Sequence, residues 1–474
     1  MANDLKRSLK RRHLIMIALG GSIGTGLFIG SGVAIHSAGP GGALLAYALI
    51  AIIVYFLMAS LGEMAAFRPT TGTFCEYTQR YVDPAFGFAM GWNYWFNWAI
   101  TVATEVIAAA LITQYWFPGT SMFLWSGFYF AVILFLNLMA VQFYGEAEYW
   151  LSFIKVSAVI LFIIVGCLSI FGIIGAGGII GLQNFTIADA PFHDGLIGFM
   201  AVFLIAGFSF QGTELIGVAA GETDNPRRAI PTAIRQTFWR LLIFYIAAIL
   251  VIGLLIPFNS PSLDGDGHTA MASPFTMVLM KAGFHYAATI MNIVILVAVL
   301  SACNASMYSA TRVLWHLGNV KQAPTVFSDI NHKGVPSAAL FATAGIGCLF
   351  VITAFLPTEQ IFFWLMQISS MAGFIAWFGI ALSHYRFRRA YISQGYDLND
   401  LPFKAKWFPW APLICLVAIT IIVLGQEFND WLKGDLSLLN FLSTYIGLLA
   451  FGILFFIYKF KYRSKLIPLK ECQL

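Results

Sequence analysis

The sequence predicts an all-α integral membrane protein with twelve transmembrane helices. Only 10% of its 474 residues are charged and 59% are hydrophobic, whereas a soluble chain carries about 25% charged residues. Apolar runs of about 20 residues, the length that a helix needs to cross the hydrocarbon core, recur along the chain. The segments between these runs are too short for a soluble domain, so a nucleotide-driven pump is not expected.

The transmembrane helices are expected in these apolar runs, with short polar loops between them. Residues 1–12 are basic, like the start of a signal peptide. The apolar segment after them is long, contains glycines and ends without a cleavage pattern, so it is expected to remain as the first helix. The expected helix cores are 13–36, 42–62, 85–114, 121–143, 148–176, 194–218, 236–257, 284–316, 337–356, 359–384, 409–427 and 437–459.

Positive charges are strongly biased to one side of these spans. With the N-terminus in the cytoplasm, 24 of the 27 Lys and Arg fall in cytoplasmic segments, Lys281 and Lys433 fall outside, and Lys155 lies within a span. This bias predicts that the N-terminal tail (1–12) and the C-terminal tail (460–474) are both cytoplasmic. Because the basic residues are dispersed over many loops, the net charge of +5 does not indicate nucleic-acid binding. The six cysteines show no paired spacing, so neither disulfides nor a metal site is indicated.

Two of the predicted spans carry glycines and polar residues at mid-membrane. Four glycines lie within residues 20–26 of the first span, and the sixth contains the polar, glycine-punctuated stretch 206–214. These stretches begin two predicted five-helix units, 13–176 and 194–384. Two further helices follow in 409–459. Since five is odd, the second unit must enter the membrane inverted, and such repeats hold a substrate between two discontinuous helices. The simpler alternative is that the glycines only allow close helix packing.

Breaks of this kind have the polarity to bind an amino acid. The N-terminus of a half-helix offers free N–H groups and a positive dipole end to a carboxylate. Residues 21–26 are therefore expected to hold the substrate carboxylate, and carbonyls near Gly20, Phe208 and Ser209 the ammonium. The predicted contacts in the first helix are Gly20, Gly21, Ser22, Ile23, Gly24, Thr25 and Gly26. A phosphate loop is not expected, because no lysine follows these glycines and they lie inside a span.

Lys155 lies about one and a half turns inside the fifth predicted helix, whereas the other basic residues are assigned to loops, tails or the flanks of spans. Ionisable groups in the membrane are costly and indicate function by default. An ammonium buried among apolar groups gives up its proton more readily than one in water, so Lys155 is a candidate for proton coupling. Its shallow depth equally allows the side chain to extend to the cytoplasmic interface, and position alone does not decide between the two.

Glu105 lies in the middle of the third predicted span. Tyr94, Trp98, Thr101 and Glu105 recur at helical spacing and so share one face. An acid on an aromatic face could hold a cationic side chain by ion pairing and cation–π contact. Ordinary interfacial or core packing is an equal alternative for the two aromatic residues.

Two further acids lie close to the sixth span. Glu214 directly follows the predicted break, where it would either line the site or brace the freed backbone. Glu222 lies at the cytoplasmic end, and either a gating role or the ordering of a loop beside neighbouring arginines would explain it. Interhelical hydrogen bonding is expected for Asn304, Ser306, Gln367 and Ser369.

Several motifs resemble those of the amino acid transporter family, in the amino acid–polyamine–organocation superfamily. They are residues 20–28, 39–42, 91–95, 144–155 with Lys155, and 209–222. The pattern runs nearly end to end, so it is more specific than any single motif. Within the family, residues 384–389 and 397–402 are similar to those of bacterial lysine-specific permeases.

This resemblance implies a LeuT-like fold of ten core helices plus two, in the inner membrane of a bacterium. It also implies a transporter rather than an enzyme, without a cofactor, that imports L-lysine with a proton and uses Lys155 for coupling. The residues that it places along the site are Tyr94, Trp98, Phe208 and Glu214. Relatives for neutral amino acids also carry acids at the Glu105 and Glu214 positions, so these acids alone do not establish a cationic substrate. The alternatives are another cationic or neutral substrate, exchange, or sensing of lysine with a regulatory membrane partner.

Overall fold

The structure is a computed structural model that describes residues 11–70, 72–139, 142–175, 178–218, 226–263, 273–426 and 438–474. Within these ranges the chain forms helices joined by turns and loops, and no strand. Nine of the described helices are long and apolar enough to cross a membrane. The prediction of an all-helical, multi-pass membrane protein is therefore confirmed. The number twelve and the inverted repeat remain predictions.

The helices differ widely in length. The longer ones are α1 (Arg11–Ser22), α3 (Gly30–Phe67), α5 (Pro84–Thr113), α6 (Met122–Asn137), α7 (Gln142–Ile170), α8 (Gly195–Phe210), α10 (Pro226–Leu255), α12 (His285–Asn319), α13 (Ser337–Gly347), α14 (Thr358–Ser393), α15 (Trp410–Leu424) and α17 (Leu438–Tyr462). The short helices are α2 (Thr25–Phe28), α4 (Thr73–Tyr81), α9 (Leu215–Val218) and α11 (Pro274–Lys281). The 3-10 helices are η1 (Gln183–Phe185), η3 (Pro261–Leu263), η4 (Thr325–Ser328), η5 (Cys348–Ala354), η6 (Leu398–Asp400) and η7 (Leu469–Glu471).

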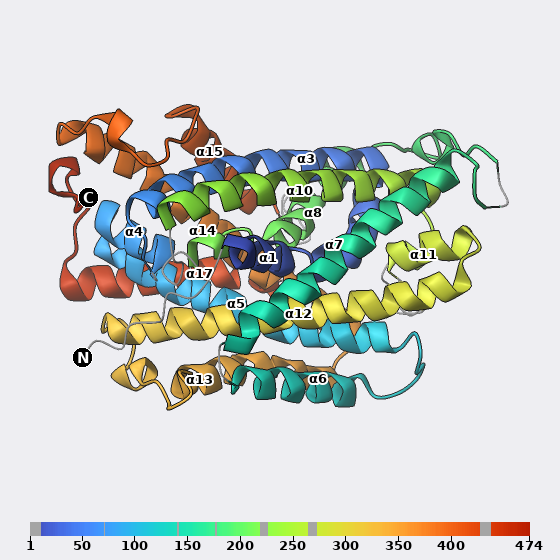
Figure 1. Cartoon of the computed structure of the whole chain (residues 1–474), viewed down its shortest axis with the longest axis horizontal. Coiled ribbons are helices and arrows are strands. Elements are labelled where there is room, and N and C mark those ends of the chain that lie inside the picture. Colours follow the sequence, from blue (N-terminus) through green and yellow to red (C-terminus); the bar gives the residue numbers. More distant parts are fainter. Residues whose placement is uncertain are drawn as a thin grey trace.

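The long helices form a bundle around α1 and α8, which belong to the two spans that the sequence predicts to be broken. In Figure 1, α3 and α10 lie along one edge of the bundle, α6 and α13 lie along the opposite edge, and α7 crosses it obliquely. Helix α5 packs against α12 and α14, and almost its whole length is buried. Helix α1 contacts α7, α10 and α12, while α8 contacts α3 and α14. Both helices that the sequence predicts to be broken therefore lie inside the bundle.

Helix α3 contains the junction between the first two predicted spans. Gly39 has a φ of +71° and a ψ of 168°, so the helical backbone is interrupted there, and Pro40 follows. A Cβ at Gly39 would lie 2.6 Å from the carbonyl oxygen of Pro191, so both the backbone conformation and the packing require glycine. Residues 30–38 and 40–67 are consequently two helical segments, and the interruption falls between the expected cores.

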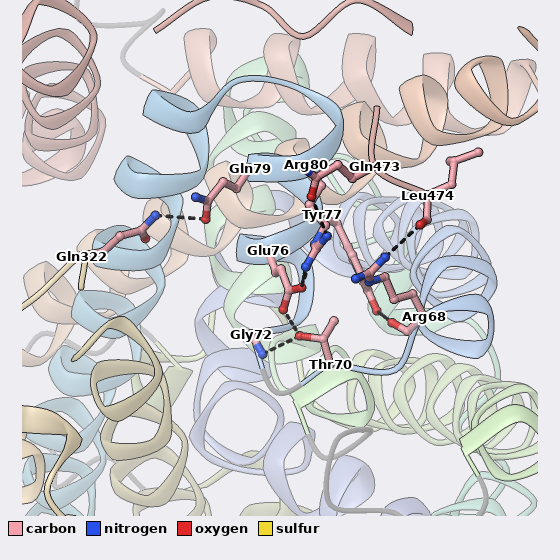
Figure 2. Close-up of polar contacts among 10 residues, drawn as sticks. All are labelled: Arg68, Thr70, Gly72, Glu76, Tyr77, Gln79, Arg80, Gln322, Gln473 and Leu474. Carbon is pink, nitrogen blue, oxygen red and sulfur yellow. Dashed lines mark hydrogen bonds and ion pairs between the residues drawn. The ribbon is translucent and has the colours of Figure 1, made fainter. Parts of the chain in front are cut away.

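The predicted cytoplasmic tail at the C-terminus is docked on α4. Arg68 donates a hydrogen bond to the carbonyl oxygen of Leu474 at 2.8 Å, and Arg80 donates one to the side chain of Gln473 at 3.0 Å (Figure 2). Arg80 also pairs with Glu76, one turn earlier in α4, at 2.6 Å. The last residues of the chain thus pack against the connection between α3 and α5.

Candidate functional site

The first helix is interrupted at Ile23 and Gly24, between α1 and α2. Gly24 has φ −145° and ψ −146°, outside the helical region. The N–H of Ile23 still bonds to the carbonyl of Leu19 at 2.9 Å. The interruption is therefore shorter than the expected stretch, because residues 20–22 end α1 and residues 25–26 begin α2.

The second interruption separates α8 from α9 at residues 211–214. It begins later than expected, so Phe208 and Ser209 still belong to the last turn of α8. Gly212 has a φ of +97°, and a Cβ there would lie 2.6 Å from the carbonyl carbon of Gly21. Only glycine fits a left-handed conformation at so close an approach. The two interruptions are thus in direct contact.

A small cavity lies between the two interruptions. Its volume is about 10 Å³, close to the room that one water molecule needs. It is lined by Gly21, Ser22, Gly24, Thr25, Gly26, Trp98, Thr101, Glu105, Phe208, Gln211, Ala302 and Ser306. Segments that are far apart in the sequence therefore converge on one point: the two interruptions, α5 and α12.

The other residues predicted for the site lie beside this cavity or outside the described ranges. Gly20, Ile23, Tyr94, Ser209 and Glu214 do not line it, and Glu222 lies outside the described residues. Glu214 accepts hydrogen bonds from Tyr94 and Trp377, each at 3.5 Å, and from the backbone N–H of Gly212 at 3.3 Å. This is the arrangement expected for an acid that braces the interrupted backbone.

Glu105 reaches from α5 to the start of α2. Its carboxylate accepts a hydrogen bond from the hydroxyl of Thr25. A Cβ at Gly24 would lie 3.4 Å from Oε1 of the same carboxylate. Glu105 therefore occupies the helix start at which a substrate carboxylate was expected. The indole N–H of Trp98, on the same face of α5, has no hydrogen-bond partner among the described residues.

Lys155 points from α7 toward the first interruption. It is fully buried, and its Nζ donates a hydrogen bond to the carbonyl oxygen of Gly20 at 2.6 Å. The side chain thus extends inward to α1, away from the surface. Glu148, two turns earlier on α7, is also fully buried. Ser301 donates to its Oε1 at 2.6 Å, and its Oε2 has no hydrogen-bond partner among the described residues. Glu148 was not predicted as a site residue, although its spacing of seven residues from Lys155 places both on one helix face.

The carbonyls expected to receive a substrate ammonium all have donors within the protein. In addition to the bond from Lys155 to Gly20, the hydroxyl of Tyr245 lies 2.6 Å from the carbonyl oxygen of Ser209 and 2.8 Å from that of Ser22. The carbonyl of Phe208 accepts the N–H of Gln211 at 3.3 Å. Tyr245, which no local pattern distinguishes, therefore ties the two interruptions together.

A polar network joins the second interruption to α5 and α14. The amide of Gln211 donates to the carbonyl of Ser369 at 3.2 Å and accepts from Asn97 at 3.3 Å. The hydroxyl of Ser369 donates to Asn97 at 2.7 Å and lies 2.8 Å from that of Thr101. Gln211 was not predicted from the sequence as a site residue. Its amide is the group that links the cavity wall to this network.

The expected interhelical bonds are present in part. Asn304 on α12 accepts a hydrogen bond from Asn137 of α6 at 2.8 Å, and Ser369 makes the bonds described above. Ser306 instead bonds to the carbonyl of Ala302 in its own helix at 2.8 Å. Gln367 makes no such bond to the described residues.

Two interrupted helices that enclose a polar cavity, inside a bundle of apolar spans, define a class of multi-pass membrane transporter. The chain belongs to the amino acid permease family, whose model matches residues 13–470. This membership confirms the predicted family, and with it a transporter rather than an enzyme.

Several relatives match this chain over nearly its full length. It is 51% identical to the lysine-specific permease LysP of Escherichia coli (strain K12), over 97% of this chain and 94% of that protein. It is 49% identical to the histidine permease HisP of Lactococcus lactis subsp. cremoris (strain MG1363), over 100% and 98% respectively. The lysine-specific permease LysP of the same strain is 48% identical, over 99% and 93%.

Proposed function

We propose that this chain is a secondary active symporter that imports L-lysine together with a proton across the inner membrane of a bacterium. The observation that carries the proposal is the cavity between the two interruptions, with backbone from the first one and the carboxylate of Glu105 on its wall. Two of the full-length relatives are lysine-specific permeases. Their similarity supports the choice of substrate within the family.

Different parts of the cavity wall would bind different parts of the substrate. Backbone N–H and carbonyl groups of the interruptions would take the carboxylate and ammonium that every amino acid carries. Glu105 and the indole of Trp98 would face the side chain, where a cation gains from ion pairing and cation–π contact. A neutral side chain would leave the buried carboxylate without a charge partner, and this cost favours a cationic substrate.

Lysine needs far more room than one water molecule, so substrate entry requires the cavity to expand. Two contacts hold the segments around the cavity together. The hydroxyl of Tyr245 shares its one proton between the carbonyl oxygens of Ser22 and Ser209, and Gly212 packs closely on Gly21. Transport would therefore involve separation of the α1–α2 and α8–α9 segments around the site.

The bond from Lys155 to Gly20 supports proton coupling at Lys155. A hydrogen bond from a charged donor contributes about 1.5–3 kcal/mol, against about 0.5–1.5 kcal/mol for a neutral one. Loss of the proton would weaken this bond and loosen the end of α1. It would also free one of the carbonyls expected to receive the substrate ammonium.

Histidine is the second candidate substrate. The histidine permease relative covers the whole chain at an identity within a few percent of that of the lysine permeases. An imidazolium, or the N–H of a neutral imidazole, could also bond to Glu105.

The decisive experiment is uptake of labelled lysine into proteoliposomes that contain the purified chain and have an alkaline interior. We expect accumulation that a protonophore abolishes and that unlabelled lysine inhibits far better than histidine, arginine or leucine. Stronger inhibition by histidine would make histidine the substrate. Uptake that requires preloaded lysine would indicate an exchanger, and binding without accumulation would indicate a sensor.

A further inference from the structure

A second, much larger cavity lies outside the transport site, at the predicted cytoplasmic ends of α3 and α10. Its volume is about 740 Å³, and its walls include Tyr55, Arg235, Trp239, Phe403, Lys404 and Lys406. Helices α3 and α10 lie side by side along one edge of the bundle (Figure 1).

Three cations converge on this cavity. Arg235, Lys404 and Lys406 are all exposed, and none of them forms an ion pair with a carboxylate of the described residues. The aromatic rings of Tyr55 and Trp239 lie on the same walls. Cationic and amphipathic aromatic side chains together are typical of the headgroup level of a membrane.

A buried ion pair holds the two lysines in place. The carboxylate of Glu63 in α3 accepts both a bond from Arg388 of α14, with Nε at 2.6 Å, and the backbone N–H of Ala405 at 2.6 Å. Arg388 in turn donates to the carbonyl of Ala405 at 3.2 Å. Both backbone groups of Ala405 are thus fixed, and the lysines on either side of it are held at the mouth of the cavity.

An apolar surface continues from the cavity toward the middle of the predicted membrane. Leu45, Leu49 and Ile52 are exposed on α3 at intervals of one helical turn, and Trp239 and Ile243 are exposed on α10. These residues precede Tyr55 on α3 and follow Arg235 on α10, so they lead away from the basic mouth along both helices. A phosphate group at the mouth could therefore have acyl chains along this surface.

We propose that this cavity binds the headgroup of an anionic phospholipid, with Arg235, Lys404 and Lys406 around its phosphodiester and the acyl chains along the apolar surfaces of α3 and α10. Each cation near a membrane surface contributes about 1 kcal/mol of attraction to anionic lipid. The apolar surface favours a lipid over a free phosphate ion, which would leave that surface unused. This site is independent of the proposed transport site and of the identity of its substrate.

The test is native mass spectrometry of the detergent-purified chain, titrated with phosphatidylglycerol, phosphatidylcholine or inorganic phosphate. The Arg235→Gln/Lys404→Gln/Lys406→Gln variant is compared with Lys333→Gln/Lys461→Gln/Lys465→Gln, which removes three exposed cations that do not line the cavity. We expect the first variant to bind phosphatidylglycerol at least about tenfold more weakly, and the second to match the unaltered chain.

Three outcomes would overturn the proposal. Equal weakening in both variants would mean that only net charge matters. Equal binding of phosphatidylcholine would remove the requirement for an anionic headgroup. Inorganic phosphate that displaces phosphatidylglycerol completely would mean that the cavity is a site for a free anion, with no contribution from the acyl chains.

Discussion

Two of the buried ionic groups, the Glu63–Arg388 pair and Lys155, differ in how completely they are satisfied. Glu63 accepts bonds from Arg388 and from the backbone of Ala405, and the guanidinium of Arg388 also lies 5.0 Å from the ring centre of Phe408. Lys155, by contrast, has a single hydrogen bond, to the carbonyl of Gly20, and forms no ion pair with an acid of the described residues.

This difference separates a structural ion pair from a group that can change partners. Glu63 and Arg388 are bonded to each other and to the backbone of Ala405, and a rearrangement would leave a buried charge without its partner, so the pair holds one arrangement. A lysine with one carbonyl partner and free donor positions can lose its proton or exchange that partner at a lower cost. The same argument applies to Glu148, whose Oε2 has no hydrogen-bond partner in the part of the chain that the structure describes.

Removal of one member of the satisfied pair should have the largest effect on stability. Arg388→Met removes the charged partner of the buried Glu63 carboxylate and leaves it with the backbone N–H of Ala405 and with His384, whose Nε2 lies 3.3 Å from Oε1. We expect this change to lower the stability of the purified protein by about 3–5 kcal/mol. The measurement is unfolding of the detergent-solubilised protein. The Glu63→Leu/Arg388→Met double variant should recover most of this loss, because it removes both charges. A stable single variant would mean that Glu63 has access to water, and the comparison with Lys155 would fail.

Removal of Lys155 should affect coupling more than folding. Lys155→Ala should abolish the dependence of lysine uptake on the pH gradient, while lysine counterflow continues. The charged hydrogen bond that is lost is worth about 1.5–3 kcal/mol. Lys281→Ala is the matched control, since Lys281 also donates to a backbone carbonyl, that of Leu255 at 3.3 Å, but lies far along the chain from both interruptions. If Lys155→Ala retained its full gradient dependence, Lys155 would be a structural residue like Arg388.

A side chain at Gly24 should block the site itself. A Cβ there would lie 3.0 Å from the Cβ of Ala302, and a larger side chain would fill the cavity. We expect Gly24→Leu to weaken lysine binding by about 1–3 kcal/mol, up to about a hundredfold. Equilibrium binding of labelled lysine measures this effect. Gly452→Leu is the control, because a Cβ at Gly452 meets no atom within 4 Å. Normal affinity in Gly24→Leu would place the substrate elsewhere.

The smallest effect is expected at Tyr245. Tyr245→Phe removes the hydroxyl that bridges the carbonyls of Ser22 and Ser209, a loss of about 0.5–1.5 kcal/mol. Because these bonds hold the cavity closed, the variant should release lysine a few-fold faster. Tyr286→Phe, at a tyrosine that is 90% exposed, serves as the control. An unchanged release rate would show that the packing of Gly212 on Gly21 alone keeps the cavity closed.

Part of the candidate site could be predicted from local sequence. Gly21, Gly24, Gly26 and Glu105 lie on the cavity wall, and the sequence singles them out because glycines inside a span and an acid at mid-span are visible within a few residues. The prediction was less accurate for the sixth predicted span, which forms α8 and α9. Its interruption begins after Phe210, and Glu214 faces Tyr94 and Trp377 instead of the cavity. Glycine content indicates that a helix can break, but the packing of neighbouring helices selects the residue at which it does.

The sequence by itself determined the class of this protein: a multi-pass helical membrane protein of the amino acid permease family, with glycine-rich interruptions in particular spans. These properties follow from composition and from motifs that span short stretches of chain. Only the tertiary structure decided which groups meet. Tyr245 bonds to a carbonyl 223 residues away, and Glu63 to an arginine 325 residues away. Such partners come from helices whose packing depends on the whole bundle, so no local pattern contains them.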